Sequence, residues 1–206
     1  MKKTLTVSLV LLLVTINGVN AQRKFLRDSS DIPIPKVIFD SKGELVITPS
    51  ATSSACDFDF LIGKWKLSHE KLRSRLSGNN EWDEFETTIE DFSILEGLGN
   101  MDVGRAVIDG KQWEGRTLRL FNPKTRLWSL YWVTSETGVL DPPVLGSFEN
   151  GVGHFFTKDT FKGRPIIMMF RWDARDKERA VWSQAFSPDN GKTWEWNWFN
   201  IKARVQ

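Results

Sequence analysis

Between Gly63 and the end of the chain, short apolar-rich segments alternate with turn sequences rich in Gly, Asn, Asp and Pro. Ser77–Asn80 and Pro188–Gly191 are examples of such turns, because Gly adopts positive φ and Asn and Asp bond their own backbone. Many short strands joined by short turns are typical of antiparallel sandwiches and barrels. A meander of about ten strands favours the barrel, since closure removes exposed sheet edges. The sequence therefore predicts an all-β, antiparallel up-and-down barrel of about ten strands.

The expected strands share an alternation of apolar and polar residues, and none has the 3.6-residue period of a long helix. The 10 Trp and 14 Phe residues agree with this prediction, because large flat side chains suit sheets. The expected strands are 64–73, 81–92, 100–108, 115–121, 127–133, 144–148, 153–158, 165–172, 179–186 and 193–203.

Residues 1–21 have the pattern of a signal peptide. Lys2 and Lys3 form a basic start, residues 5–16 are mostly apolar, and the segment ending at Ala21 has the small-x-small form of a cleavage site. The apolar run is shorter than the roughly 20 residues of a spanning helix. We therefore expect cleavage after Ala21, a periplasmic or secreted chain and no membrane span after cleavage, with an N-terminal anchor as the alternative.

Cleavage would change the charge of the chain. The full sequence has 28 basic and 26 acidic residues, and the leader holds two of the lysines and no acid. The remaining 26 basic residues equal the 26 acidic ones in number. A neutral chain without a basic cluster argues against nucleic acid as a partner, and the sequence gives no indication of the oligomeric state.

Residues 22–55 differ in composition from the rest, and we expect an N-terminal extension followed by a barrel domain at 56–206. Residues 37–47 resemble a hairpin and residues 48–55 a tether, and both docking on the barrel and mobility stay open. The single cysteine, Cys56, excludes an intramolecular disulfide, and we expect a buried thiol there.

The stretch from Phe58 to Leu67 marks the first strand of the barrel. Its apolar front half is expected to cap one end, and Gly63 and Trp65 then open a strand pattern. Gly-x-Trp at this position resembles the opening signature of lipocalins and related calycin barrels. The resemblance implies that Trp65 plugs the closed end and that Lys202 or Arg204 packs over its ring.

A second resemblance is to uncharacterised bacterial lipocalin-like proteins, which begin with a Phe-Asp-Phe-x-x-Gly-x-Trp-like segment, as at 58–65. The stretches 140–144, 170–172 and 182–186 are also similar to these proteins, and the likeness covers about residues 57–204. It implies a barrel of about ten strands and no established activity.

Residues 187–194 match the Asp-box of sialidase-type propellers, Ser-x-Asp-x-Gly-x-Thr-Trp. Sialidase propellers repeat this motif in several blades, and it occurs once here. We interpret it as a structural hairpin staple, in which Asp189 caps backbone donors, Gly191 has positive φ and Trp194 packs beneath.

Setting the last three expected strands in register divides their side chains into two faces, and a one-residue slip would exchange them. The face that we expect inside has two polar members, Gln184 and Asn197. It carries Met168, Phe170, Trp172, Trp182, Gln184, Asn197 and Phe199. The other face includes an arginine, which is costly to bury unpaired. It carries Ile167, Met169, Arg171, Val181, Ser183, Ala185, Trp194, Trp196 and Trp198.

Isolated polar residues within apolar strands are candidates for ligand binding, because a pocket is mostly apolar with a few fixed polar groups. A solid core with satisfied hydrogen bonds is the alternative interpretation. His69 is in phase with Trp65 and should point inward, whereas no ligand pattern around it or His154 supports a metal. The predicted ligand-binding residues are Gln184, Asn197, Trp182, Arg119, Tyr131 and His69.

These observations favour an exported barrel that binds a small apolar or amphipathic ligand, with no cofactor, metal or catalytic residue assigned. The first alternative is a hydrolase or isomerase in the same barrel, using His69 or a carboxylate such as Glu86 as general base. Glu86 belongs to an alternating strand whose acidic face we expect to be solvated. The second alternative is a surface for carbohydrate or protein built on Trp196 and Trp198.

Overall fold

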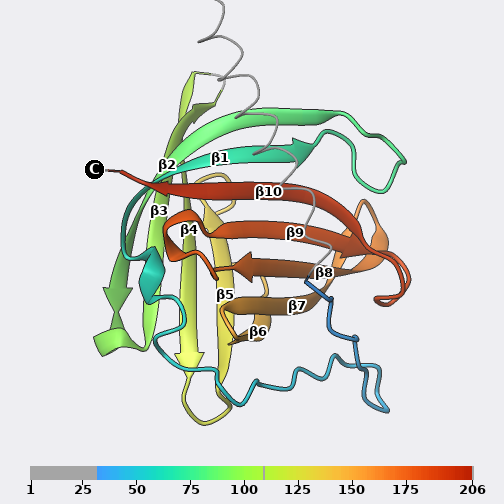
Figure 1. Cartoon of the computed structure of the whole chain (residues 1–206). Coiled ribbons are helices and arrows are strands. Elements are labelled where there is room, and N and C mark those ends of the chain that lie inside the picture. Colours follow the sequence, from blue (N-terminus) through green and yellow to red (C-terminus); the bar gives the residue numbers. More distant parts are fainter. Residues whose placement is uncertain (1–31, 109, 206) are drawn as a thin grey trace, which may run out of the picture. The chain divides into compact units, whose positions relative to one another are not determined.

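Ten antiparallel strands form a closed barrel in this computed structural model, which describes residues 32–108 and 110–205 (Figure 1). Each strand pairs with the next in sequence, and β1 also pairs with β10. The predicted fold class is confirmed, whereas the predicted signal peptide lies outside the described residues. The strands are β1 Gly63–Leu72, β2 Trp82–Ile94, β3 Gly99–Ile108, β4 Lys111–Asn122, β5 Leu127–Thr134, β6 Val144–Glu149, β7 Val152–Phe161, β8 Arg164–Asp173, β9 Val181–Ser187 and β10 Glu195–Arg204.

The connections between strands define two ends of the barrel. The end that we call the closed end carries the short helix η1 (Asp59–Leu61), η2 (Leu95–Gly97) between β2 and β3, and η3 (Lys177–Arg179) between β8 and β9. The opposite end, called the open end, carries the β1–β2, β3–β4, β5–β6, β7–β8 and β9–β10 connections. In Figure 1, β3–β5 run down the view and β8–β10 run across it.

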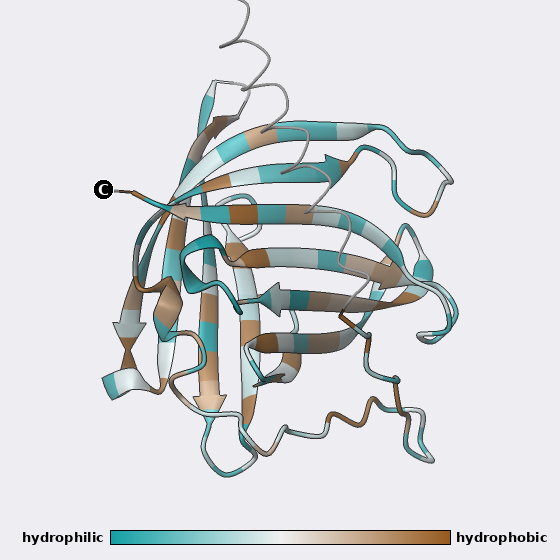
Figure 2. Ribbon diagram, in the orientation of Figure 1, coloured by the Kyte–Doolittle hydropathy of each residue, from teal (hydrophilic) through white to brown (hydrophobic). Residues whose placement is uncertain are grey.

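Strand pairing identifies the inner face. Trp172, Trp182, Asn200 and His69 are successive Cα partners across β8, β9, β10 and β1, so their side chains share one face. Trp172 packs on Phe58, which enters the barrel from the chain segment before β1. This face is therefore the interior, as predicted for the even-numbered residues of β8 and β9. Exposed and buried residues alternate along the first half of β1, as this arrangement requires, whereas the second half is mainly hydrophilic in Figure 2.

A β-bulge in β10 corrects the predicted register of the last strand. Trp196 pairs with Ala185 and Trp198 pairs with Gln184, the next residue along β9. β10 therefore has one unpaired residue, Asn197, between two consecutive pairs of the ladder. A bulge changes the parity of the side chains that follow it. Trp198 consequently faces inward and Phe199, which pairs with Ser183, faces outward. The predicted common face of Trp194, Trp196 and Trp198 was wrong for Trp198.

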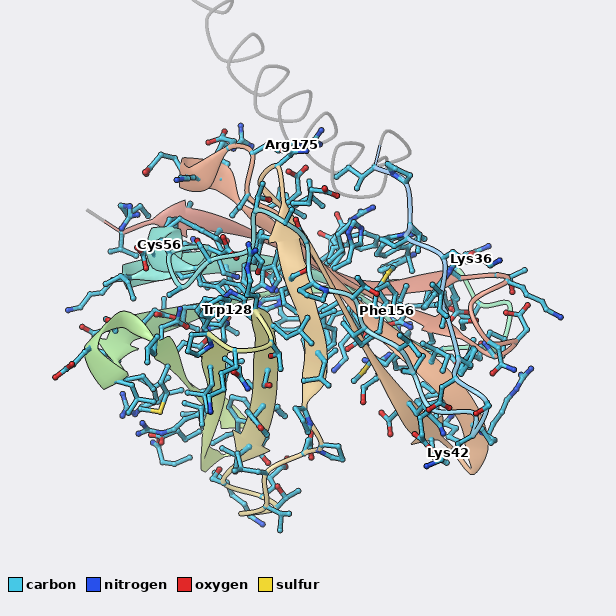
Figure 3. All side chains as sticks on the ribbon, turned by 90° about the horizontal axis from the view of Figure 1, so that it is seen from below. Lys36, Lys42, Cys56, Trp128, Phe156 and Arg175 are labelled. Atoms are coloured by element: carbon cyan, nitrogen blue, oxygen red, sulfur yellow. The ribbon has the colours of Figure 1, made fainter. Side chains whose placement is uncertain are left out.

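The segment before the barrel contacts the strands at both of its ends. Phe39 and Leu45 form a single β-bridge, and Lys158 of β7 donates to the Gly43 carbonyl at 3.1 Å. Figure 3 labels Lys42, which lies in this turn. Nearer to β1, the Ser50 amide donates to the Ser147 hydroxyl on β6 at 2.9 Å. Docking of residues 37–55 on the barrel is thus observed, within the compact unit that starts at Pro35.

The turn that leads into η1 contains the free cysteine. Asp57 accepts from the Ser54 amide at 2.9 Å and Phe58 turns into the barrel, which leaves Cys56 exposed. The prediction of a buried thiol was wrong, because the apolar residue that follows two positions later takes the interior site instead. Among the described residues, no helix is both long and apolar enough to cross a membrane.

Candidate ligand-binding site

An aromatic plug fills the closed end of the barrel. The ring of Phe58, fully buried, lies 4.9 Å from the rings of both Trp128 and Phe148 and 5.5 Å from that of Trp172, edge to face in each case. Such pairs contribute about 0.5–1.5 kcal/mol each beyond the burial of their area. We define the plug as Phe58, Phe60, Leu61, Trp128, Phe148, Phe155 and Trp172.

Trp65 seals the closed end beside the plug, as the resemblance to calycin barrels implied. Its indole N–H donates to the Leu61 carbonyl, and the guanidinium of Arg204 lies 4.2 Å from the centre of its ring. Arg204 also donates to the Ile62 carbonyl at 3.1 Å. Lys202 and Arg204 were the two basic residues expected to pack over Trp65. Arg204 makes this contact, whereas the Nζ of Lys202 lies 4.5 Å from the ring centre of Trp172.

Arg119, a predicted ligand residue, belongs to a buried charge cluster next to the plug. Its Nη1 donates to Asp91 and to Asn100, both at 2.9 Å, and its Nη2 donates to Asp102. Its guanidinium also lies 5.6 Å from the ring of Trp172. Because Arg119 is 3% exposed, water does little to solvate its charge. The carboxylates of Asp91 and Asp102 balance the charge instead.

Lys202 completes the charge cluster, which we define as Arg119, Asp91, Asp102 and Lys202. Burial, together with the positive charge of Arg119, lowers the pKa of Lys202 to about 7. Burial also raises the pKa of Asp91 to about 6, although Arg119 opposes this shift. Both shifts have desolvation as their main cause, which fits a site sealed from water by the plug.

The inner wall at the open end is built differently, from aromatic rings and neutral amides. Trp198 contacts Trp182 edge to face at 5.5 Å, and Trp182 contacts Phe170 at 5.0 Å. On the other side of Trp198, His69 stacks on Phe85 with their ring centres 4.5 Å apart. We define the mouth wall as Phe85, His69, Trp198, Trp182, Phe170, Gln184 and Asn197.

Both ring nitrogens of His69 are engaged in the mouth wall. The indole N–H of Trp198 donates to Nδ1 at 3.1 Å, and Nε2 lies 2.8 Å from the Thr87 hydroxyl. Nδ1 must therefore accept, and Nε2 carries the proton of a neutral ring. Burial, followed by the positive charges of Lys202 and Lys71, lowers the pKa of His69 to about 3. The histidine thus forms a rigid neutral part of the wall.

Gln184 and Asn197 form the polar pair that the sequence predicted. The Gln184 amide nitrogen donates to the Asn197 side-chain oxygen at 2.9 Å, and both residues are buried. Asn197 reaches this position because it is the extra residue of the β10 bulge. The pair places a buried amide contact beside the aromatic rings of the mouth wall.

Exposure distinguishes the open end from the closed end. Phe85 and Trp132, which both belong to the inner face, are 38% and 37% exposed. Trp113 lies beside Trp132, with ring centres 6.1 Å apart. Side chains on an inner wall reach solvent only where the barrel interior is open, so the mouth wall borders an accessible surface.

The structure brings together four of the six predicted ligand residues. Gln184, Asn197, Trp182 and His69 lie in the mouth wall, whereas Arg119 lies deeper, in the charge cluster. Tyr131 pairs with Leu118 and has the parity of the outer face, half-buried and apart from the others. Its neighbours in sequence, Leu130 and Trp132, take the inner positions.

The residues predicted as structural occupy the turn and the start of β1. Asp189 accepts from the Thr193 amide at 2.9 Å and from its hydroxyl at 2.6 Å, and these bonds lower the pKa of Asp189 to about 2. Gly191 has φ of +85°, and a Cβ at this position would lie 2.5 Å from the Val37 side chain and 3.6 Å from the Trp194 ring. Gly63 has φ of +118° at the entry to β1.

Two residues at the open end were not singled out from the sequence. Lys71 lies on the inner face of β1, one row beyond His69, and its Nζ is 4.0 Å from the ring centre of Trp198. Arg75 follows in the β1–β2 connection, with its guanidinium 5.8 Å from the same ring. The sequence could have indicated that Lys71 points inward, because it alternates in phase with Trp65 and His69 along the strand.

Two surface hollows lie away from the mouth wall. One, of about 430 Å³, is lined by residues of the 37–47 segment and of β7 and β8, including Phe39 and Ile167. The other, of about 380 Å³, includes Cys56 and Phe148 near the closed end. Within the part of the chain that the structure describes, no group of three or more His, Cys, Asp or Glu side chains is placed to hold a metal ion.

Comparison with known proteins supports the fold. The chain is similar to the solved structure of the S-type phycobiliprotein lyase CPES from Guillardia theta, with a TM-score of 0.50 and 10% sequence identity over 76% of this chain and 94% of that chain. At this identity the likeness shows a lipocalin-like barrel and no more. No protein-family model matches the chain, and no curated protein matches it.

Proposed function

We propose that the chain is an exported lipocalin-like barrel whose mouth wall binds a small, largely apolar ligand. Export rests on the signal-peptide pattern of residues 1–21, and membership of a bacterial lipocalin-like family rests on the sequence stretches described above. The single observation that carries the ligand proposal is the contrast in exposure along one inner face. Phe58 and Trp128 are sealed at the closed end, whereas Phe85 and Trp132 are more than a third exposed at the other.

The chemistry of the mouth wall supports an apolar ligand with one polar contact. Its aromatic rings offer apolar area, and small-molecule sites combine such area with a few fixed polar groups. The buried Gln184–Asn197 pair supplies these groups. Because the plug fills the closed end, the ligand would enter from the opposite end.

The geometry favours this function over the two alternatives considered. Glu86 lies on the outer face of β2, exposed and paired with Lys66 at 2.8 Å, and His69 has no free ring nitrogen to act as a base. Trp196 lies outside beneath Arg171 at 4.2 Å, while Trp198 lies inside. The two tryptophans therefore cannot form one flat platform.

Fluorescence titration tests the proposal with a matched pair of variants. N-phenyl-1-naphthylamine should bind with increased emission, and lipids extracted from the native host should displace it. Trp198→Ala should reduce the affinity of the probe about tenfold, because a buried aromatic contact contributes on the order of 1–2 kcal/mol. Trp196→Ala, on the same strand but the outer face, should change its affinity by less than about twofold. No probe binding, or equal losses in both variants, would overturn the proposal.

A further inference from the structure

Two cations stand at the open end beside the mouth wall. Lys71 and Arg75 are both half-buried, and both lie against the ring of Trp198, at 4.0 and 5.8 Å. Arg75 also lies 5.4 Å from the ring of Phe186. The aliphatic stems of the two side chains therefore pack on the wall, with their charged heads next to its aromatic surface.

The carboxylates near these cations are already engaged elsewhere. Arg73 binds Asp83, the cross-strand Cα partner of Lys71, at 2.8 Å and Glu81 at 3.1 Å. Glu195 accepts from the Leu76 amide with both oxygens, at 2.7 and 2.9 Å. Among the described residues, neither Lys71 nor Arg75 has a carboxylate oxygen within 4 Å.

The electrostatic state of Lys71 agrees with a role in binding an anion. Burial and then the charge of Arg75 lower its pKa, and Asp83 offsets this only in part. Two like charges held half-buried near one ring repel each other, and an anion between them would remove that cost. The same anion would raise the pKa of Lys71.

We propose that Lys71 and Arg75 bind the anionic head of an amphipathic ligand whose apolar body lies on the mouth wall, an inference that rests on the proposed function. The contrast with the charge cluster supports it. Arg119 has two carboxylates of its own within hydrogen-bond distance, whereas Asp83 and Glu195 act on Lys71 and Arg75 only through longer-range charge. The ligand class is a single-chain amphiphile carrying a carboxylate or a phosphate monoester.

Displacement of N-phenyl-1-naphthylamine by three ten-carbon amphiphiles tests the inference. Decanoate and decyl phosphate carry the anion in its two forms, and decanol is the neutral match. At low salt, at least one anion should displace the probe at about tenfold lower concentration than decanol, since a charge-assisted hydrogen bond contributes about 1.5–3 kcal/mol. The ratio of the two anions identifies the head group, and high salt should reduce their advantage.

Variants separate a charge effect from a structural one. Lys71→Gln should reduce the affinity for the preferred anion five- to tenfold and change the affinity for decanol by less than about twofold. Lys71→Arg should restore the preference for the anion. Lys66→Gln, an exposed lysine on the outer face of the same strand, should change neither. Urea unfolding confirms that each variant is folded.

The outcomes separate this inference from the proposed function. Equal displacement by decanol and both anions would overturn the anion site while leaving apolar ligand binding intact. An equal loss of decanol and anion in Lys71→Gln, not restored by Lys71→Arg, would also overturn it. Failure of the probe itself to bind would remove both.

Discussion

The two ends of the inner wall come from the same ten strands, yet their charged and aromatic residues differ in exposure and in ion pairing. At the closed end, the plug has little or no exposed surface and Arg119 is bound by Asp91 and Asp102. At the open end, aromatic rings reach solvent, and Lys71 lies against a ring without a bound carboxylate. The difference indicates that the closed end is a completed core, whereas the open end presents groups to something outside the chain.

Breaking the charge cluster should have the largest effect on stability. Arg119→Met leaves Asp91 and Asp102 buried without the guanidinium that binds both of them, which costs about 3–5 kcal/mol. Urea unfolding measures the loss, and Arg105→Met, which removes an exposed partner of Glu114, should cost about 0.5 kcal/mol or less. Adding Asp91→Asn and Asp102→Asn to Arg119→Met should recover part of the loss. A cost as small as that of Arg105→Met would show that the cluster does not hold the closed end.

Truncating one aromatic ring at each end compares the two regions directly. Phe58→Ala removes a fully buried ring at the centre of the plug and should cost about 3 kcal/mol or more. Phe85→Ala removes a ring that is 38% exposed, and about 1 kcal/mol is expected. Chemical unfolding of both variants provides the comparison. Equal losses would mean that the mouth wall is packed as tightly as the plug.

Between pH 7 and pH 5, acid should weaken the mouth wall through His69, whereas Asp91 in the charge cluster acts in the opposite direction. The pKa of His69 is lowered to about 3, so the unfolded chain binds more protons from pH 6.5 downward and stability falls as pH drops. The pKa of Asp91 is raised to about 6, so its contribution has the opposite sign and decreases as pH rises toward 6. Each group contributes at most about 1.4 kcal/mol per pH unit.

Urea midpoints at pH 7, 6 and 5 measure this pH dependence. His69→Gln should flatten the decline below pH 6.5, and Asp91→Asn should make it steeper. Burial also lowers the pKa of His154, on the outer face of β7, to about 4. Its protonation therefore adds to the loss of stability in acid, with the same sign as that of His69. Parallel pH profiles for His69→Gln and the native chain would contradict the assignment.

The seal at Trp65 should show the smallest effect. Arg204→Met removes the cation from the ring of Trp65 and the bond to the Ile62 carbonyl, at a cost of about 1 kcal/mol because Arg204 is exposed. Arg204→Lys should recover about half of this. Thermal unfolding resolves the two variants, and an unchanged midpoint in Arg204→Met would show that the plug closes this end without the arginine.

Local patterns predicted much of the barrel. The ten alternating segments each fall on one strand, because alternation and turn chemistry act over a few residues. The inward direction of His69 followed from its phase with Trp65, and the Gln184–Asn197 contact followed from their polar character on one apolar face. β4 begins earlier than expected, at Lys111, because its first residues are polar and pair with the end of β3.

What the sequence did not indicate depends on long-range geometry. The β10 bulge has no local signal, yet it decides that Trp198 lines the interior and Trp196 does not. Arg119 was found as an isolated polar residue, but its partners Asp91 and Asp102 lie on two other strands and read as ordinary strand residues. Tyr131 was predicted as a ligand residue without regard to its parity, which places it outside.

The resonances of the tryptophan indole N–H groups test the central claim most directly. In a two-dimensional ¹⁵N spectrum assigned with Trp→Phe variants, N-phenyl-1-naphthylamine should shift the signals of Trp198 and Trp182 at the open end. The signals of Trp65 and Trp128 at the closed end, and of Trp196 on the outer face, should stay in place. Shifts confined to Trp65, Trp128 or Trp196 would contradict a binding site at the mouth wall.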